Sequence, residues 1–380
     1  MKSFFHLRSL QISRRIPLIL VLLAFGLLGV SGSVIAASTV DLYQEQVVVS
    51  QNASQKEQNE AIQSSFARLL VRVTGITQVL EYPTVIDELK QGSKYLATFR
   101  FEPSDVFFTN VLGEKVPTKL MNLTFDKKTV DAFLVQNRLP VWGEKRPDVL
   151  FWIADRLEGQ DHILADAEES RLASIVAEQT DIRGIPYLLP IMDLTDSLTL
   201  SFSEVYGLFS QDIEVASERY KPEAILTGRV LAGSDENSYQ ADWLMLFKGE
   251  RLRLPTVTGT LEEVIAQGVD LVAQRLSEQY ALILDPLMLG NLTLKVSDIQ
   301  SLGEFAALER YLQTINIITK ATVRSFSGTD VEFNVEISGD QSQLQDVLAL
   351  DGQLTPVEEV SLEAQLDNRL VFQWQEKNKP

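Results

Sequence analysis

The sequence contains no cysteine and only two histidines among its 380 residues. Disulfide bonds, cysteine nucleophiles and cysteine-based zinc sites are therefore excluded. His6 lies in the N-terminal segment 1–37, so His162 is the one histidine in the rest of the chain. It stands in the run GQDHILADA, between two expected elements, where a solvated loop histidine is the expected role. We predict no metal site, no cofactor and no histidine-based triad.

Positive charge is also scarce, because 34 lysines and arginines face 52 aspartates and glutamates, which gives a net charge of −18. Phosphate backbones and anionic lipid headgroups repel a chain this acidic. Nucleic acid is therefore not an expected partner, and neither is a membrane surface.

The segment from Met1 to Ala37 has the three parts of a secretory signal. Four basic residues and no acid precede Ile16, the stretch from Ile16 to Val30 is almost entirely apolar, and small residues follow. We expect residues 1–37 to be a signal peptide that exports the chain to the periplasm. The alternative is an N-terminal inner-membrane anchor with the rest of the chain facing the periplasm. Removing these four basic residues would change the net charge from −18 to −22.

The 343 residues after Ala37 are too many for one small core, and periodicity divides them into modules. Residues 38–145 predict a β-α-β-β-α module, in which Phe66, Leu69 and Leu70 belong to one helical stripe that ends at Gly75. The strands are expected at 94–103 and 119–126, after a first strand near 40–50.

Residues 146–285 predict a central mixed-sheet module, because strands first alternate with helices and then follow one another directly. The run PDVLFWIAD is typical of a strand buried on both faces. Further strands are expected at 185–193 and 250–259, and a single helix at 201–220. A capping box of Thr260 and Glu263 starts the last helix.

Residues 286–361 have the β-α-β-β-α-β order of a ferredoxin-like module, and residues 362–380 are expected to add an edge strand and a tail. The predicted fold class is α+β, with three small α/β modules in series and mixed sheets covered by helices.

Four runs resemble a protein family called Domain of Unknown Function 2066. They are AxxxxFARLLVRVTG, RPDVLFWIAD, RGIPYLLPIMDLTD and EVYGLFSQDIEVASERYKPEAILTGRV. The resemblance implies an exported proteobacterial protein without an established activity. At the level of fold, residues 218–281 are similar to the N-terminal domain of the periplasmic protein TolB, which implies binding to other envelope proteins.

Candidate site residues lie where the central strands end, because ligands on open α/β sheets bind beyond the carboxyl ends of strands. Asp155 follows the first strand, Asp193 and Asp196 follow the second, and Arg229 lies on the third. Aspartates at such junctions commonly cap helices, which is the expected role. Paired carboxylates can also catalyse glycoside hydrolysis without histidine or cysteine.

Two functions of different classes therefore stay open. We expect a non-enzymatic interaction or envelope-assembly module whose partner is another envelope protein. For this module, the only expected contact with a membrane is through the N-terminal segment, if that segment is not cleaved. The alternative is a carboxylate-dependent hydrolase acting on an envelope polysaccharide. A deep cleft that holds two of the candidate carboxylates favours the hydrolase, and capped, shallow aspartates favour the binding module.

Overall fold

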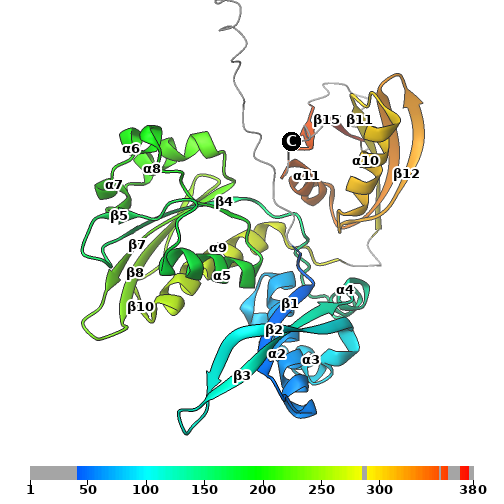
Figure 1. The fold of residues 1–380 in the computed structure, drawn as a ribbon. Coiled ribbons are helices and arrows are strands. Elements are labelled where there is room, and N and C mark those ends of the chain that lie inside the picture. Colours follow the sequence, from blue (N-terminus) through cyan, green and yellow to red (C-terminus); the bar gives the residue numbers. More distant parts are fainter. Residues whose placement is uncertain (1–40, 285–288, 351, 358–368, 376–380) are drawn as a thin grey trace, which may run out of the picture. The chain divides into compact units, whose positions relative to one another are not determined.

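The computed structural model describes residues 41–284, 289–350, 352–357 and 369–375. These residues form three sheets with helices packed against them (Figure 1), which confirms the α+β class. The first two sheets fall within the predicted modules 38–145 and 146–285, whereas the third also takes in β15 from the segment 362–380. The exact boundaries at 145, 285 and 361 stay predictions. The predicted signal or anchor lies outside the described residues. Within those residues, no helix has the length and apolarity needed to cross a bilayer.

The first sheet has the strand order β1-β3-β2, and all its neighbours are antiparallel. Its elements are β1 (Gln44–Ser50), α2 (Gln55–Thr74), α3 (Pro83–Leu89), β2 (Leu96–Thr109), β3 (Lys115–Phe125) and α4 (Lys127–Gln136). Phe66, Leu69 and Leu70 are fully buried, as their spacing predicts. Strands β2 and β3 are longer than predicted, because the chain resumes pairing after an irregularity between Pro103 and Phe107.

The central sheet has the order β10-β8-β7-β4-β5, with β6 paired to β4 and β9 paired to β8. Its strands are β4 (Val149–Asp155), β5 (His162–Ile163), β6 (Tyr187–Leu188), β7 (Ala224–Ala232), β8 (Tyr239–Phe247), β9 (Glu250–Arg253) and β10 (Val257–Gly259). Its helices are α5 (Arg171–Arg183), α6 (Leu194–Thr199), α7 (Phe202–Tyr206), α8 (Ser210–Ser217) and α9 (Leu261–Tyr280). All of β4 is buried, as predicted. Phe151 and Ile153 pack in the cluster of α5 and α9, and Leu150 and Trp152 pack in the cluster of α7 and α8.

Three predicted elements of the central module are shorter or broken. The strand expected at 185–193 is only β6, because its two prolines cannot donate to the ladder. The helix expected at 201–220 is divided into α7 and α8, with Leu208 between them in the left-handed region at φ 57°. The strand expected at 250–259 is interrupted at Pro255 and becomes β9 and β10.

The third sheet has the order β12-β13-β11-β15-β14. Its elements are β11 (Leu289–Ser297), α10 (Leu302–Gln313), β12 (Ile318–Ser327), β13 (Asp330–Ser338), α11 (Gln341–Ala349), β14 (Leu354–Pro356) and β15 (Arg369–Trp374). The predicted β-α-β-β-α-β sequence is present from β11 to β14. The final strand differs from the prediction, because β15 lies inside the sheet and runs parallel to β11. Leu370, Phe372 and Trp374 alternate along β15 and are buried. One face of β15 therefore packs in the core.

One fully buried arginine joins the first and central sheets. The Arg146 guanidinium makes five hydrogen bonds of 2.6–3.2 Å to backbone carbonyl oxygens, namely those of Arg72, Trp142, Gly143, Arg183 and Gly184. Three of these carbonyls belong to the C-terminal ends of α2 and α5, where a helix leaves its last carbonyls without internal partners. The guanidinium therefore satisfies two helix ends at once and complements their negative dipoles.

Two further arginines complete this contact between helix ends. Arg72 Nε donates to the carbonyl oxygen of Ile182 at 3.2 Å, and Arg183 Nη2 donates to that of Gly75 at 2.7 Å. Gly75 has φ 78°, and a Cβ there would lie 2.2 Å from the Cβ of Ser277.

Burial, followed by the charges of Arg72 and Arg183, lowers the pKa of Arg146 well below its ordinary value. Only a charge with many hydrogen bonds can be held in such a place.

We predict that Arg146→Met lowers the free energy of unfolding by about 3–5 kcal/mol, because it leaves several buried carbonyl oxygens without donors. Arg146→Lys should be intermediate, since an ammonium has three donors. The exposed Arg156, which pairs with Asp161, supplies the control Arg156→Met, expected to change stability by less than about 1 kcal/mol. Urea denaturation measures all three variants. Equal midpoints for Arg146→Met and Arg156→Met would refute the role of Arg146.

Candidate functional site

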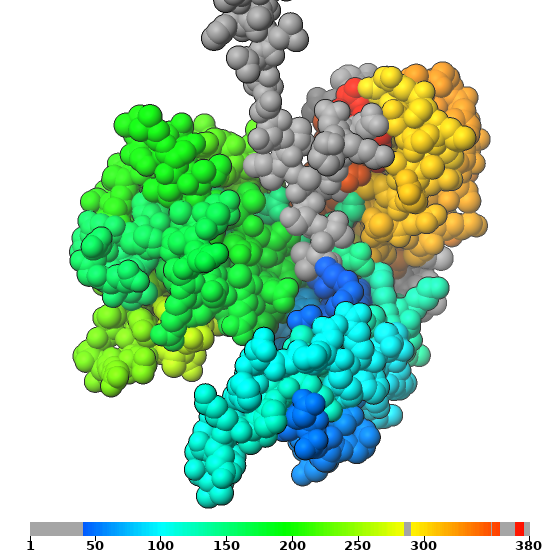
Figure 2. Space-filling view, viewed as in Figure 1, coloured from blue at the N-terminus to red at the C-terminus, as the bar shows by residue number. Residues whose placement is uncertain are grey.

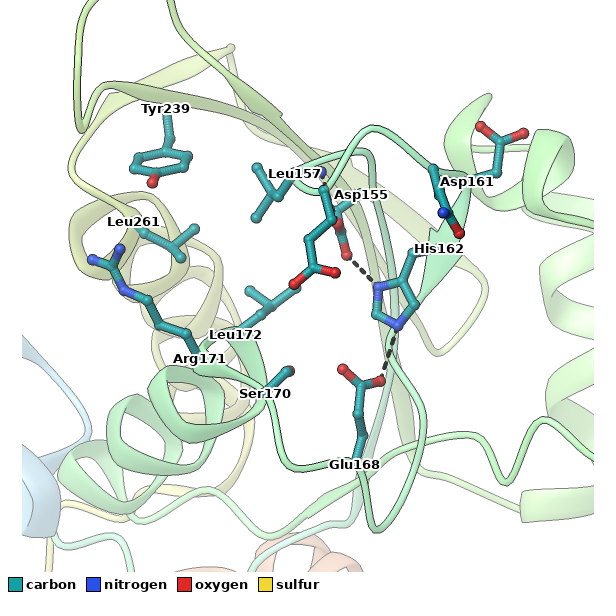
Figure 3. Close-up of a pocket in the computed structure, with 12 residues that line it drawn as sticks. Asp155, Leu157, Asp161, His162, Glu168, Ser170, Arg171, Leu172, Tyr239 and Leu261 are labelled. Atoms are coloured by element: carbon teal, nitrogen blue, oxygen red, sulfur yellow. Dashed lines mark hydrogen bonds and ion pairs between the residues drawn. The ribbon is translucent and has the colours of Figure 1, made fainter.

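A cavity of about 310 Å³ lies beyond the carboxyl end of β4, where open α/β sheets bind ligands. Asp155, at the end of β4, lines it together with His162 of β5 and Glu168 of the loop before α5 (Figure 3). Leu172 and Leu261, at the starts of α5 and α9, supply apolar walls. The cavity is therefore a polar cluster beside an apolar wall, which is the usual composition of a small ligand site.

The polar cluster is centred on His162, which the sequence predicts to be a solvated loop residue. Its Nδ1 lies 2.6 Å from Asp155 Oδ2, and its Nε2 lies 2.9 Å from Glu168 Oε2 (Figure 3). Asp155 is buried, and its other oxygen accepts a hydrogen bond from the Leu157 backbone N–H at 3.0 Å. The ring thus ties together β4, β5 and the loop that leads into α5.

The environment of His162 favours the imidazolium. Burial opposes the charged form, but the hydrogen bond and charge of Asp155, with those of Glu168, outweigh it and raise the pKa of His162 above 6.5. The pKa of Glu168 is lowered, since its hydrogen bonds and the His162 charge outweigh its burial. A ring with both nitrogens bonded to carboxylates has none free to accept a proton from a substrate. The cluster is better suited to holding three chain segments than to general base catalysis.

Asp193 and Asp196 do not line this cavity. Asp193 is the N-cap of α6 and accepts a hydrogen bond from the Asp196 N–H at 3.0 Å. Arg219 Nη1 lies 2.8 Å from an oxygen of each aspartate, and Tyr220 donates its hydroxyl to the buried Asp196 at 2.5 Å. The hydrogen bonds from Arg219 are the main reason why the pKa of Asp193 lies below its ordinary value. This pair caps a helix and holds the segment after α8 against it.

Arg229 also lies outside the lining of this cavity and binds other groups. Its Nε lies 2.8 Å from Asp242 Oδ2 on the neighbouring strand β8, and its Nη1 donates to the carbonyl oxygen of Tyr206 at 3.3 Å. Of the four predicted site residues, only Asp155 therefore reaches the cavity. His162 and Glu168 are the cavity residues that sequence reasoning missed. Among the described residues, no group of three or more histidine, aspartate or glutamate side chains has the arrangement needed to hold a metal ion.

A second candidate surface is the hairpin formed by β2 and β3. We call residues 99–119 the arm, which projects from the first sheet as the cyan finger in Figure 2. Its apolar side chains are unusually exposed: 45% for Phe99, 53% for Phe107, 102% for Val111 and 78% for Leu112. Apolar exposure concentrated in one element marks an interaction site more often than single exposed residues do.

The tip of the arm is built as a defined turn. Asn110 Oδ1 accepts hydrogen bonds from the backbone N–H groups of Leu112 and Glu114, at 3.0 and 2.9 Å. Gly113 has φ 80°, the left-handed conformation that glycine adopts without strain. Val111 and Leu112 are therefore presented to solvent by an ordered turn.

Residues 36–143 match a protein family described as Domain of unknown function (DUF8605). The match includes the first sheet and the arm, and its description states no activity. Neither the comparison with curated proteins nor the comparison with solved structures gives a match.

This finding corrects the resemblance to Domain of Unknown Function 2066, because the matched family is a different one. Three of the four runs that carried the resemblance lie within residues 146–230, outside the match. They contain the buried strand β4 and the amphipathic segments around β6, α7 and α8, whose apolar spacing any helix-covered sheet requires. A likeness to the TolB N-terminal domain is not supported by any match.

We predict a pH-dependent contribution of His162 to stability. Its folded pKa is above 6.5, so this contribution is complete below pH 6.5 and is lost as the pH rises through the folded pKa. The difference in unfolding free energy between the wild type and His162→Gln should therefore shrink between about pH 6 and about pH 9. Urea denaturation across this range measures it. A difference that stays constant would contradict the imidazolium assignment.

Proposed function

We propose that this chain is exported through residues 1–37 and acts in the periplasm as a non-enzymatic module that binds another protein of the cell envelope. The arm is the binding surface in this proposal. Its support comes from one observation above all, the exposure of phenylalanine, valine and leucine side chains along and at the end of an ordered hairpin. Exposed aromatic residues on a rigid element are favourable anchors at protein interfaces.

The arrangement of the three candidate aspartates also favours binding over hydrolysis. A glycosidase needs two carboxyl groups on either side of one bond, about 5–10 Å apart. Asp155 lines the cavity and bonds His162, whereas Asp193 and Asp196 are bonded to Arg219 and lie outside the cavity lining. Each of these carboxylates already has strong partners, so each has a structural role that needs no substrate.

We predict that benzoyl-phenylalanine at position 107 in the arm gives a discrete crosslinked product with one envelope protein in intact cells. The matched control is the same amino acid at position 236, in the polar turn between β7 and β8, which is also exposed. Immunoblots and mass spectrometry identify the products. Identical products at both positions, or none at position 107, would contradict the arm as the binding surface.

Substitutions separate binding from catalysis in the same assay. Phe107→Ser together with Leu112→Ser should abolish the product when the crosslinking residue is placed at position 101. Asp193→Asn should leave the crosslinked product unchanged, because asparagine caps a helix about as well as aspartate.

Complementation is a second test. In a strain that lacks the protein, Asp193→Asn should restore function and the double arm variant should not. A folded Asp193→Asn protein that fails to restore function would favour the hydrolase.

A further inference from the structure

The arm carries a free hydrogen-bonding edge in addition to its apolar side chains. Strand β2 is the last strand of the order β1-β3-β2, so within the part of the chain that the structure describes, one side of its backbone has no neighbouring strand. We propose that β2 receives an extended, acidic segment of the partner protein as an additional strand. This inference rests on the proposed function, and it specifies the chemistry of the partner. Strand addition to a sheet edge gives affinity through backbone hydrogen bonds and specificity through alternate side chains.

Three of the four phenylalanines of β2, namely Phe99, Phe101 and Phe107, stand in a row on one face of the sheet. Cross-strand pairs share a face, and Phe99 and Phe101 are paired with Leu123 and Met121, which are core residues of the first sheet. Phe107 is paired with Pro117. Pro117 lies on the same face of β3 as Met121 and Leu123, because side chains two or four residues apart on a strand point to the same side. The helices that bury β3 leave β2 exposed along almost its whole length. A strand added beside β2 would cover this row with every second side chain.

Two lysines place positive charge over the same row. Lys119 Nζ lies 4.0 Å from the centre of the Phe101 ring, and Lys115 Nζ lies 5.9 Å from that of Phe107. Both ammonium groups come from β3 but stand above rings of β2, one strand closer to the free edge. An aspartate or glutamate on an added strand would therefore lie within reach of an ammonium group, next to an apolar contact with a ring. Glu102 of β2 forms an ion pair with Arg100 and is paired with Leu120, on the opposite face. The lysine charge on the ring-bearing face therefore favours an acidic partner segment.

The open edge argues against a lipid occupant. Backbone N–H and C=O groups in hydrocarbon cost several kcal/mol each when unpaired, so open sheet edges are not exposed to lipid. The like charges argue against a second copy of this chain, because two arms pairing through β2 would bring Lys115 and Lys119 of both copies together. A polypeptide of opposite charge satisfies the backbone edge, the rings and the lysines together.

The edge is divided, which limits indiscriminate pairing. The register of β2 and β3 shifts between Pro103 and Phe107, and proline has no N–H to offer a neighbour. Bulges and prolines are devices by which natural sheets protect an edge from aggregation. Two shorter regular segments remain, Thr98–Glu102 and Phe107–Thr109, each with exposed phenylalanine side chains.

A display library of random linear peptides, panned on the purified full chain, tests the proposal. Enriched peptides should alternate acidic and apolar residues, and methylation of alternate backbone nitrogens in a synthetic copy should abolish binding. The double variant Lys115→Glu, Lys119→Glu should bind this peptide about tenfold more weakly, because two ion pairs become repulsive. A peptide with lysine in place of its acidic residues should regain binding to that variant. Circular dichroism checks that the exposed substitutions leave the fold intact.

Several results would overturn the proposal. Enriched peptides without acidic residues, binding unaffected by backbone methylation, or no rescue by the charge-reversed peptide would each do so. Co-sedimentation of the chain with phosphatidylglycerol vesicles through the arm would indicate lipid, and an arm-dependent dimer in light scattering would indicate a second copy. If position 107 still crosslinks to one envelope protein, only the strand-addition inference fails. If that crosslink is also absent, the proposed function fails with it.

Discussion

The guanidinium of Arg146, buried among five backbone carbonyl oxygens, holds the first and central sheets to one another. Two helices end at this point, α2 at Thr74 and α5 at Arg183, and the carbonyls of both ends need donors that the helices cannot supply. A single planar cation with five donors solves the problem, which is why lysine would be a poor substitute.

The same requirement, that backbone polar groups find partners, accounts for the contrast between the interior and the arm. Inside, the ends of α2 and α5 are paired through Arg72, Arg146 and Arg183. On the arm, one edge of β2 lacks a paired strand among residues 41–284, 289–350, 352–357 and 369–375, and it lies beside exposed phenylalanine rings. The arm is therefore a place where a partner can gain hydrogen bonds and apolar burial together. This contrast is the physical basis of the proposed binding role.

Local periodicity was sufficient to predict the elements whose faces are buried, but not the contacts between distant segments. The stripe of Phe66, Leu69 and Leu70 and the unbroken run of β4 follow from apolar spacing. The His162 cluster does not, because Asp155 and Glu168 meet the ring only after β4 and β5 pair and the following loop returns. The arm was missed because Pro103, Ser104 and Asp105 resemble a strand end, whereas β2 continues to Thr109 beyond a change in register. Its exposure depends on which strand the helices leave uncovered.

Hydrogen exchange of the chain, free and in complex with the protein captured by crosslinking at position 107, tests the central claim most directly. If the arm is the binding surface, amides of β2 (Leu96–Thr109) should exchange more slowly in the complex, while those around the His162 cavity should not change. New protection confined to residues 155–172, with β2 unchanged, would place the partner at the cavity and contradict the account.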